Sequence, residues 1–67
     1  MYNNTEKMIN FIENVLIPDI LDHKTRGYKR YIFTCGYGVN PLAVIAEVEK
    51  RIKCKGNAMC ASAYFYL

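Results

Sequence analysis

Apolar side chains recur at three- and four-residue spacing through the first third of the chain, and this spacing predicts an amphipathic helix. Asn3 or Asn4 is suited to the N-cap position, and Glu6 would complete a capping box if Asn3 is the cap. The predicted apolar stripe consists of Met8, Ile9, Phe11, Ile12, Val15, Leu16, Ile20 and Leu21.

Pro18 interrupts this helical pattern. Proline cannot donate to the carbonyl four residues earlier and it restricts the residue before it, so we expect a kink or a break near Ile17. A short continuation should then run through Leu21, and Gly27 should act as a C-cap or turn residue.

The pattern next predicts a strand and a second helix. Residues 28–35, YKRYIFTC, are rich in aromatic and β-branched types and alternate as a strand does. Asn40 is suited to cap a helix that has Pro41 at its first position and runs to about Lys55, with Gly56 after its end. We expect Leu42, Ile45, Val48 and Ile52 on one face and the ion pairs Glu47–Arg51 and Glu49–Lys53 on the helix surface.

Residues 58–67, AMCASAYFYL, predict a last strand that is nearly uncharged and buried on both faces. The chain therefore reads as one small α/β (α+β) domain over residues 1–67, in the order helix, strand, helix, strand. A strand, a helix and a strand in succession predict a right-handed parallel crossover. Two parallel strands are too little sheet for water, so we expect a homodimer to complete the fold.

Composition adds an expectation about partners and location. The chain is 52% hydrophobic and holds six tyrosines, a large apolar content for 67 residues, and this favours an interface with a second copy or with another protein. Three cysteines without a signal peptide predict free thiols in a reducing cytoplasm. No apolar run approaches the roughly 20 residues of a membrane span, so no membrane contact is expected.

The formal net charge of +3 is unevenly distributed. Residues 1–22 are acidic, and the later part of the chain is basic. One basic segment, KTRGYKRY, combines cations with tyrosines, and such a mixture can neutralise phosphates while aromatic rings stack on bases. Its candidate residues for binding a partner or nucleic acid are Lys24, Arg26, Tyr28, Lys29, Arg30 and Tyr31. The other reading of this segment is a solvated turn whose tyrosines pack on the core. A second basic group at Lys50, Arg51, Lys53 and Lys55 could extend the same surface.

The loop between the first strand and the second helix is a candidate anion site. Cys35 ends the strand, Gly36 and Gly38 permit close backbone approach, and Asn40 precedes the N–H groups of the helix. A thiol in such a loop would have a lowered pKa and could act as a nucleophile. The sequence of residues 30–52 resembles the phosphocysteine loop of the B components of bacterial sugar phosphotransferase systems. The resemblance implies that Cys35 carries a phosphoryl group. The other reading is a simple turn.

The remaining candidate chemistry is sparse. His23, Cys35, Cys54 and Cys60 lack the paired short spacing of structural zinc sites, so no metal and no cofactor are expected. No acid or nucleophile stands in a recognisable relation to His23, the only histidine.

We therefore expect a small non-enzymatic protein that binds and modulates or inhibits a macromolecular partner. A viral or mobile-element inhibitor of a host complex would have these properties. The alternatives are a phosphate-binding or phosphoryl-carrier protein that uses the Cys35 loop, and a basic nucleic-acid-binding module.

Overall fold

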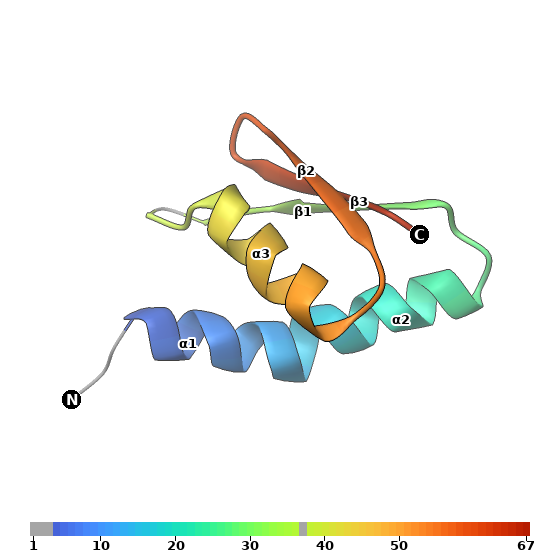
Figure 1. The fold of residues 1–67 in the computed structure, drawn as a ribbon, viewed down its shortest axis with the longest axis horizontal. Helices are drawn as coiled ribbons and strands as arrows, with labels where there is room; N and C mark the ends of the chain where they lie inside the picture. The colour runs from blue at the N-terminus through green and yellow to red at the C-terminus, as the bar shows by residue number, and fades with distance from the viewer. Residues whose placement is uncertain (1–3, 37) are drawn as a thin grey trace.

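The computed structural model describes residues 4–36 and 38–67, and it places the helices on one side of a three-stranded antiparallel sheet (Figure 1). The mixed α/β class and the order helix, strand, helix, strand are confirmed, with one addition: the predicted last strand is part of a hairpin of two strands. The elements in chain order are α1 (Asn4–Phe11), η1 (Ile12–Leu16), α2 (Ile17–Thr25), β1 (Arg30–Thr34), α3 (Pro41–Arg51), β2 (Lys55–Met59) and β3 (Ser62–Tyr66).

Pro18 does not break the first helix. The segment η1 is a π-helical turn between α1 and α2, and the N–H of Ile17 donates to the carbonyl of Ile12, five residues earlier. A wider turn immediately before Pro18 relieves the clash that its ring would make with a regular α-helical carbonyl. The prediction was a kink or a break near Ile17: no break occurs, a π-helical turn stands at this place, and the helix continues past Leu21 to Thr25. Asn3, one of the two predicted caps, lies outside the described residues.

Gly27 ends this long helix as predicted. Its φ is +89°, a conformation that glycine adopts without steric cost. The N–H of Tyr28 donates to the carbonyl of His23 at 3.0 Å, and the N–H of Gly27 donates to that of Lys24 at 3.1 Å. This pair of bonds is a Schellman motif, and it turns the chain toward β1.

The start of α3 is also as predicted, whereas its end is not. The N–H of Leu42 donates to Oδ1 of Asn40 at 3.0 Å, and Pro41 is the first helical residue. The helix ends at Arg51 rather than near Lys55, because Ile52 already has an extended backbone. The predicted buried face is partly wrong: Ile45 and Val48 are buried as expected, but Val44 is buried in place of Leu42, which is 63% exposed.

The segment predicted as one last strand is part of a β-hairpin. β2 and β3 pair antiparallel around the two-residue turn Cys60–Ala61, and β3 also pairs antiparallel with β1, so the sheet order is β1-β3-β2. The predicted parallel crossover is therefore wrong. Cys60 has a φ of +54°, and a non-glycine residue in that conformation gives little warning of a turn in the sequence.

Alternation along the strands separates a covered face of the sheet from an open one. On β3, Ala63 and Phe65 are fully buried against the helices, whereas the side chain of Tyr66 is 51% exposed. The predicted burial of both faces is therefore wrong. The largest fully buried side chains of the core are Ile12, Leu16, Ile20, Val44, Val48 and Phe65.

The third strand also removes the reason for expecting a dimer. Three antiparallel strands covered by helices on one face form a sheet that does not need strands from a second copy. The homodimer remains a prediction. In the described ranges, no helix has both the length and the apolar character required to cross a membrane.

Candidate functional site

The two basic segments of the sequence meet at one end of the molecule, where β1 and β2 begin and α3 ends. Arg30, Tyr66 and Lys55 lie side by side across the sheet, because Tyr66 is in register with both cations. The adjacent carbonyl of Lys29 accepts a hydrogen bond from the N–H of Leu67 at 2.9 Å. Lys24 lies close to Cys54, because its charge opposes the rise in the pKa of the Cys54 thiol that partial burial causes. The antiparallel register therefore joins two segments that are separate in the sequence.

Five cations of this region have no acidic group within ion-pair distance among the described residues. The ion pairs that do form use other cations, namely Arg26 with Asp22, Lys50 with Glu47, and Arg51 with Glu13 and Glu47. The unpaired group consists of Lys24, Lys29, Arg30, Lys53 and Lys55, and we call it the basic end. Unneutralised charges gathered in one region produce a positive potential that attracts anionic partners.

A groove of about 670 Å³ lies beside the basic end. Tyr66 contributes to its wall and also belongs to the open face of the sheet, so the groove and the sheet face share this side chain. The other lining residues are Glu49, Lys50, Arg51, Ile52, Lys53, Cys54 and Lys55. The groove therefore has basic walls and an aromatic side chain at the point where it meets the sheet.

The early end of α3 shapes this groove. Because the helix stops at Arg51, Lys53 is not placed one turn after Glu49, and the predicted pair Glu49–Lys53 does not form. Oε2 of Glu49 instead accepts the backbone N–H of Gly56 at 2.9 Å. The predicted pair Glu47–Arg51 is confirmed at 2.9 Å. Lys53 is thereby left as an unpaired cation beside the groove.

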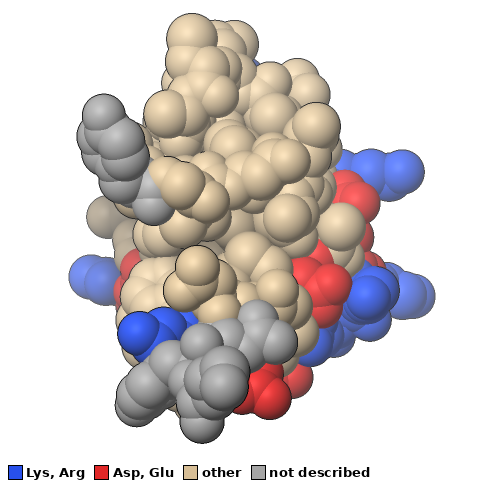
Figure 2. Space-filling view, turned by 90° about the vertical axis from the view of Figure 1, so that its left-hand side faces the viewer, with Lys and Arg blue, Asp and Glu red and all other residues tan. Residues whose placement is uncertain are grey.

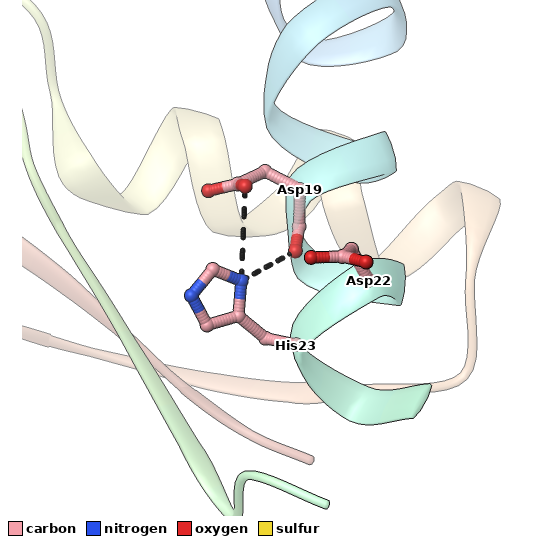
Figure 3. Close-up of side chains that lie close together, drawn as sticks. All are labelled: Asp19, Asp22 and His23. Atoms are coloured by element: carbon pink, nitrogen blue, oxygen red, sulfur yellow. Dashed lines mark hydrogen bonds and ion pairs between the residues drawn. The ribbon is translucent and has the colours of Figure 1, made fainter. Parts of the chain in front are cut away.

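A second polar cluster lies on the last turns of α2. His23 Nδ1 is 2.7 Å from the carbonyl oxygen of Asp19 and 3.7 Å from Oδ1 of the same residue, as Figure 3 shows. A carbonyl oxygen only accepts, so Nδ1 carries the proton. The imidazole also packs against two tyrosine rings, with centroid distances of 5.2 Å to Tyr28 and 5.0 Å to Tyr31.

Tyr31 ties this cluster to the sheet. Its hydroxyl donates to Oδ2 of Asp19 at 2.5 Å. Partial burial of the ring raises the pKa of Tyr31 well above its usual value, and the hydrogen bond and the negative charge of Asp19 raise it further. Tyr31 therefore keeps its proton, and we assign it to joining β1 and α2.

The structure divides the six residues predicted to bind a partner. Lys24, Lys29 and Arg30 belong to the basic end. Arg26 pairs with Asp22 at 3.4 Å, and its guanidinium carbon lies 6.0 Å from the centre of the Tyr28 ring. Tyr31 packs against the core beside Phe65. Three of the predicted residues thus remain available as unpaired charges, while the others have partners within the chain.

The candidate anion loop has its helix-start donors already occupied. Pro41 has no N–H, the N–H of Leu42 bonds to the Asn40 side chain, and the N–H of Ala43 bonds to the Asn40 carbonyl at 3.0 Å. Gly36 accepts a hydrogen bond from the N–H of Val39 at 3.1 Å, and Gly38 has a φ of +76°. These bonds favour a structural turn over an anion cradle.

Cys35 lies at the end of β1, and its side chain is buried. Its N–H donates to the carbonyl of Ala61 at 2.8 Å, which extends the pairing toward the hairpin turn. Burial raises the pKa of the Cys35 thiol, the opposite direction to the one a nucleophile would require. Cys54 is partly buried and Cys60 is exposed, so Cys35 is the one buried thiol of the three.

Sequence reasoning missed one potential ligand cluster. Asp19, Asp22 and His23 bring ligand atoms within 4.8 Å of one another on one side of α2, although their spacing of three and four residues could have indicated it (Figure 3). Oδ2 of Asp19 already accepts from Tyr31, and Nδ1 of His23 is a donor. Exposed carboxylates at helical spacing do not by themselves define a metal site.

Sequence reasoning also missed the position of Tyr66 between two cations. Tyr66 lies on the open face of β3, and its neighbours there depend on the antiparallel register of three strands, which the sequence pattern does not predict. Comparison with protein-family models, with curated proteins and with solved structures gives no match for this chain. The resemblance of residues 30–52 to the phosphocysteine loop remains a hypothesis.

Proposed function

We propose that this protein is a small non-enzymatic binding protein and that its ligand is a nucleic acid, held through the phosphate backbone by the basic end. The observation that carries this proposal is the gathering of five unpaired cations at the end of the molecule where β1 and β2 begin, two of which, Arg30 and Lys55, flank Tyr66. Phosphate neutralisation by such groups is the main source of affinity in nucleic-acid binding.

The distribution of charge supports this choice over a diffuse positive surface. Figure 2 views the molecule from the end where α1 begins and β1 leads into α3, and the upper part of this view is almost wholly uncharged, whereas the charged side chains lie along the flanks and below. Residues 31–46 and 56–67 contain no charged side chain, so the cations are concentrated in the segments that form the basic end. Concentrated charge is more effective than the same net charge spread over the surface.

The non-enzymatic part of the proposal rests on the two residues best suited to catalysis. Cys35 is buried with a raised pKa, and His23 is held by Asp19 and by two tyrosine rings. Both side chains have structural roles in the fold. A phosphoryl carrier that uses Cys35 would need the thiolate to be exposed to its donor and acceptor.

A protein ligand is the second candidate, and one specific observation favours it. The uncharged end of the molecule exposes the large apolar side chains of Leu42 and Met59, which are 63% and 57% exposed. Exposed apolar groups of this kind are typical of protein interfaces. In this case the protein would act as a modulator or inhibitor that engages a partner through the uncharged end.

Fluorescence anisotropy with a labelled single-stranded oligonucleotide of about 12 nucleotides, of mixed sequence, would test the proposal. We expect binding that weakens steeply between about 50 and 200 mM salt. The variant Arg30→Ala/Lys53→Ala/Lys55→Ala should reduce the slope of log K against log salt by up to about 3, one for each phosphate that is no longer neutralised.

The control is Lys7→Ala, which removes one positive charge on α1, away from the basic end (Figure 1). It should change the slope little. Absence of binding at the lowest salt, or equal effects of the control and the triple variant per charge removed, would contradict the proposal. Binding of an acidic protein with no binding of oligonucleotide would favour the second candidate.

A further inference from the structure

The open face of the sheet has no helix over it. The helices lie together on the other side of the strands (Figure 1), and on β1 and β2 the residues of the open face are all exposed, whereas those of the covered face are partly buried. β3 is the central strand, so its outward side chains stand in the middle of this face. An uncovered sheet face of this kind is a surface on which a ligand can lie flat.

Two tyrosines occupy the middle of the open face. Tyr64 and Tyr66 alternate with the buried Ala63 and Phe65, so their rings point to the same side and are separated by about 6.8 Å along the strand. In register across the sheet, Tyr66 lies between Arg30 and Lys55, and Tyr64 lies between Ile32 and Asn57.

We propose that this face binds single-stranded nucleic acid, with Tyr66 and Tyr64 stacking on two unpaired bases while Arg30 and Lys55 contact the adjacent phosphates. The inference rests on the proposed function and specifies the class of nucleic acid. Aromatic side chains stack on any base, and flanking cations follow the backbone, which is the usual division of work in single-strand binding. Asn57, beside Tyr64, adds an amide that can both donate to and accept from a base edge.

The same geometry argues against the other occupants of this face. A duplex hides its base faces within the helical stack, so it could use the cations but not the tyrosine rings. A second copy stacked here about a two-fold axis near Tyr66 would bring Arg30 and Lys55 of both copies together, and like charges oppose such an interface. A single strand satisfies both the rings and the charges.

The test compares a labelled oligouridine of about 12 nucleotides with a duplex of about the same length, by anisotropy at fixed salt. We expect the single strand to bind at least about 10-fold more tightly than the duplex. Tyr66→Leu and Tyr64→Leu should each weaken single-strand binding by about 5-fold or more, since stacking is removed, and leave duplex binding unchanged. Tyr66→Phe is the matched control, because it keeps the ring and should retain the affinity.

The outcomes separate this inference from the proposed function. If both leucine variants bind oligouridine as the natural protein does, while the triple cation variant loses binding, the stacking inference is overturned and backbone binding stands. If neither oligonucleotide binds, both proposals are overturned. If Tyr66→Leu converts a dimer into a monomer in sedimentation without weakening oligouridine binding, the face is an interface between copies and the inference fails. Circular dichroism of each variant establishes that the fold is intact.

Discussion

Gly56 lies where α3 crosses β2, and no larger residue fits there. A Cβ at this position would lie 2.7 Å from Cγ2 of Ile45 and 3.1 Å from Cδ1 of Phe65. Both neighbours are buried, so neither can move away at low cost. Gly56, which the sequence pattern places after a helix end, is therefore required by the packing of α3 on the sheet.

We predict that Gly56→Ala lowers the free energy of unfolding by about 1–3 kcal/mol, the usual cost of overpacking a core. Urea denaturation would measure it. Gly36→Ala is the control, because nothing lies within 4 Å of a Cβ at that position. Equal stability of the two variants would show that the core accommodates the added methyl group.

Cys60 occupies the first turn position of the β2–β3 hairpin with a φ of +54°, while no positive φ is found at Ala61. This is the pattern of a type II′ turn, which prefers glycine at its first central residue. We predict that Cys60→Gly raises stability by up to about 1 kcal/mol, as relief of the strained conformation exceeds the entropy that glycine adds to the unfolded chain.

The midpoint of thermal denaturation would measure the rise in stability of Cys60→Gly. Ala61→Gly, at the second turn position, should instead lower the midpoint, and a rise of similar size in both variants would exclude relief of strain at Cys60 as the cause. Cys60→Ser should be nearly neutral because the thiol is exposed. A buried thiol at this position would instead have lost stability on replacement by serine.

The Tyr31–Asp19 hydrogen bond predicts a stability change at alkaline pH. The unfolded chain ionises a tyrosine near pH 10, while the raised pKa of Tyr31 keeps its proton in the folded state. Above about pH 10 the unfolded state therefore binds fewer protons than the folded state, and stability falls as pH rises.

Tyr31→Phe should remove this part of the pH dependence and lower stability near neutral pH by about 0.5–1.5 kcal/mol. Urea midpoints at about pH 8 and about pH 11 would measure both effects. Tyr28→Phe is the control, because the hydroxyl of Tyr28 has no hydrogen bond among residues 4–36 and 38–67. An unchanged alkaline loss of stability in Tyr31→Phe would exclude this hydroxyl as its source.

At the scale of elements, Arg51 joins the long first helix to α3. Its Nε donates to Glu13 at 3.0 Å and its Nη1 donates to Glu47 at 2.9 Å. The hydrogen bond from Arg51, with a second from Lys50, lowers the pKa of Glu47. The stability from this interaction is therefore present above the ordinary pKa of a glutamate and is lost as pH falls through the lowered value.

We predict that Arg51→Met destabilises the protein at neutral pH and low salt, and that the difference from the natural protein shrinks in acid and at high salt. Urea denaturation at several pH values and salt concentrations would test this. Lys53→Met removes a cation that has no ion pair in the described chain and should change stability little. A salt-independent loss would point to packing of the Arg51 stem instead.

Elements whose ends are set by local backbone chemistry could be predicted from the sequence. Asn40 with Pro41 defines one helix start, and Gly27 defines one helix end, because each acts within a few residues of its own position. The sheet could not be predicted in the same way. Its pairing depends on the turn at Cys60 and on a strand that begins with Lys55 and Gly56, residues with low strand preference.

The candidate site shows the same division. The cations of the basic end could be identified as two sequence segments, but their union around Tyr66 follows only from the register of three strands. The sequence leaves two readings of Tyr31 open, and its contacts with Phe65 and Asp19 favour packing on the core, which depends on the face of β1 that the helices cover. Sequence therefore predicted the composition of the site better than its geometry.

At the scale of the whole molecule, charged and uncharged surfaces are segregated. The uncharged end includes Val39, Leu42 and Met59, all exposed. If the homodimer expected from composition forms, this end would be its natural interface, since it leaves free the basic end and the part of the open sheet face around Tyr66.

We predict that Leu42→Glu shifts a dimer of this kind toward monomer, because it places a charge in an apolar contact. Sedimentation at rising protein concentration would measure the change. Lys50→Glu, on the charged side of α3, is the control for an added negative charge. A 7.8 kDa monomer of the natural protein at high concentration would contradict the dimer.

The central position of β3 has a consequence for how the chain folds. β1 and β2 each pair only with β3, the last of the strands in sequence, so Arg30 can pair with Tyr66 only after the chain through Tyr66 has been synthesised. During synthesis from the N-terminus, the apolar strand β1 therefore has no pairing strand until the ribosome has added β3. Contacts of long sequence separation slow folding, and an unpaired apolar strand can associate with other chains during that delay. Only the long first helix, residues 4–25, precedes β1 in the chain, and its contacts with Tyr31 and Phe33 would cover one face of β1 before the sheet exists.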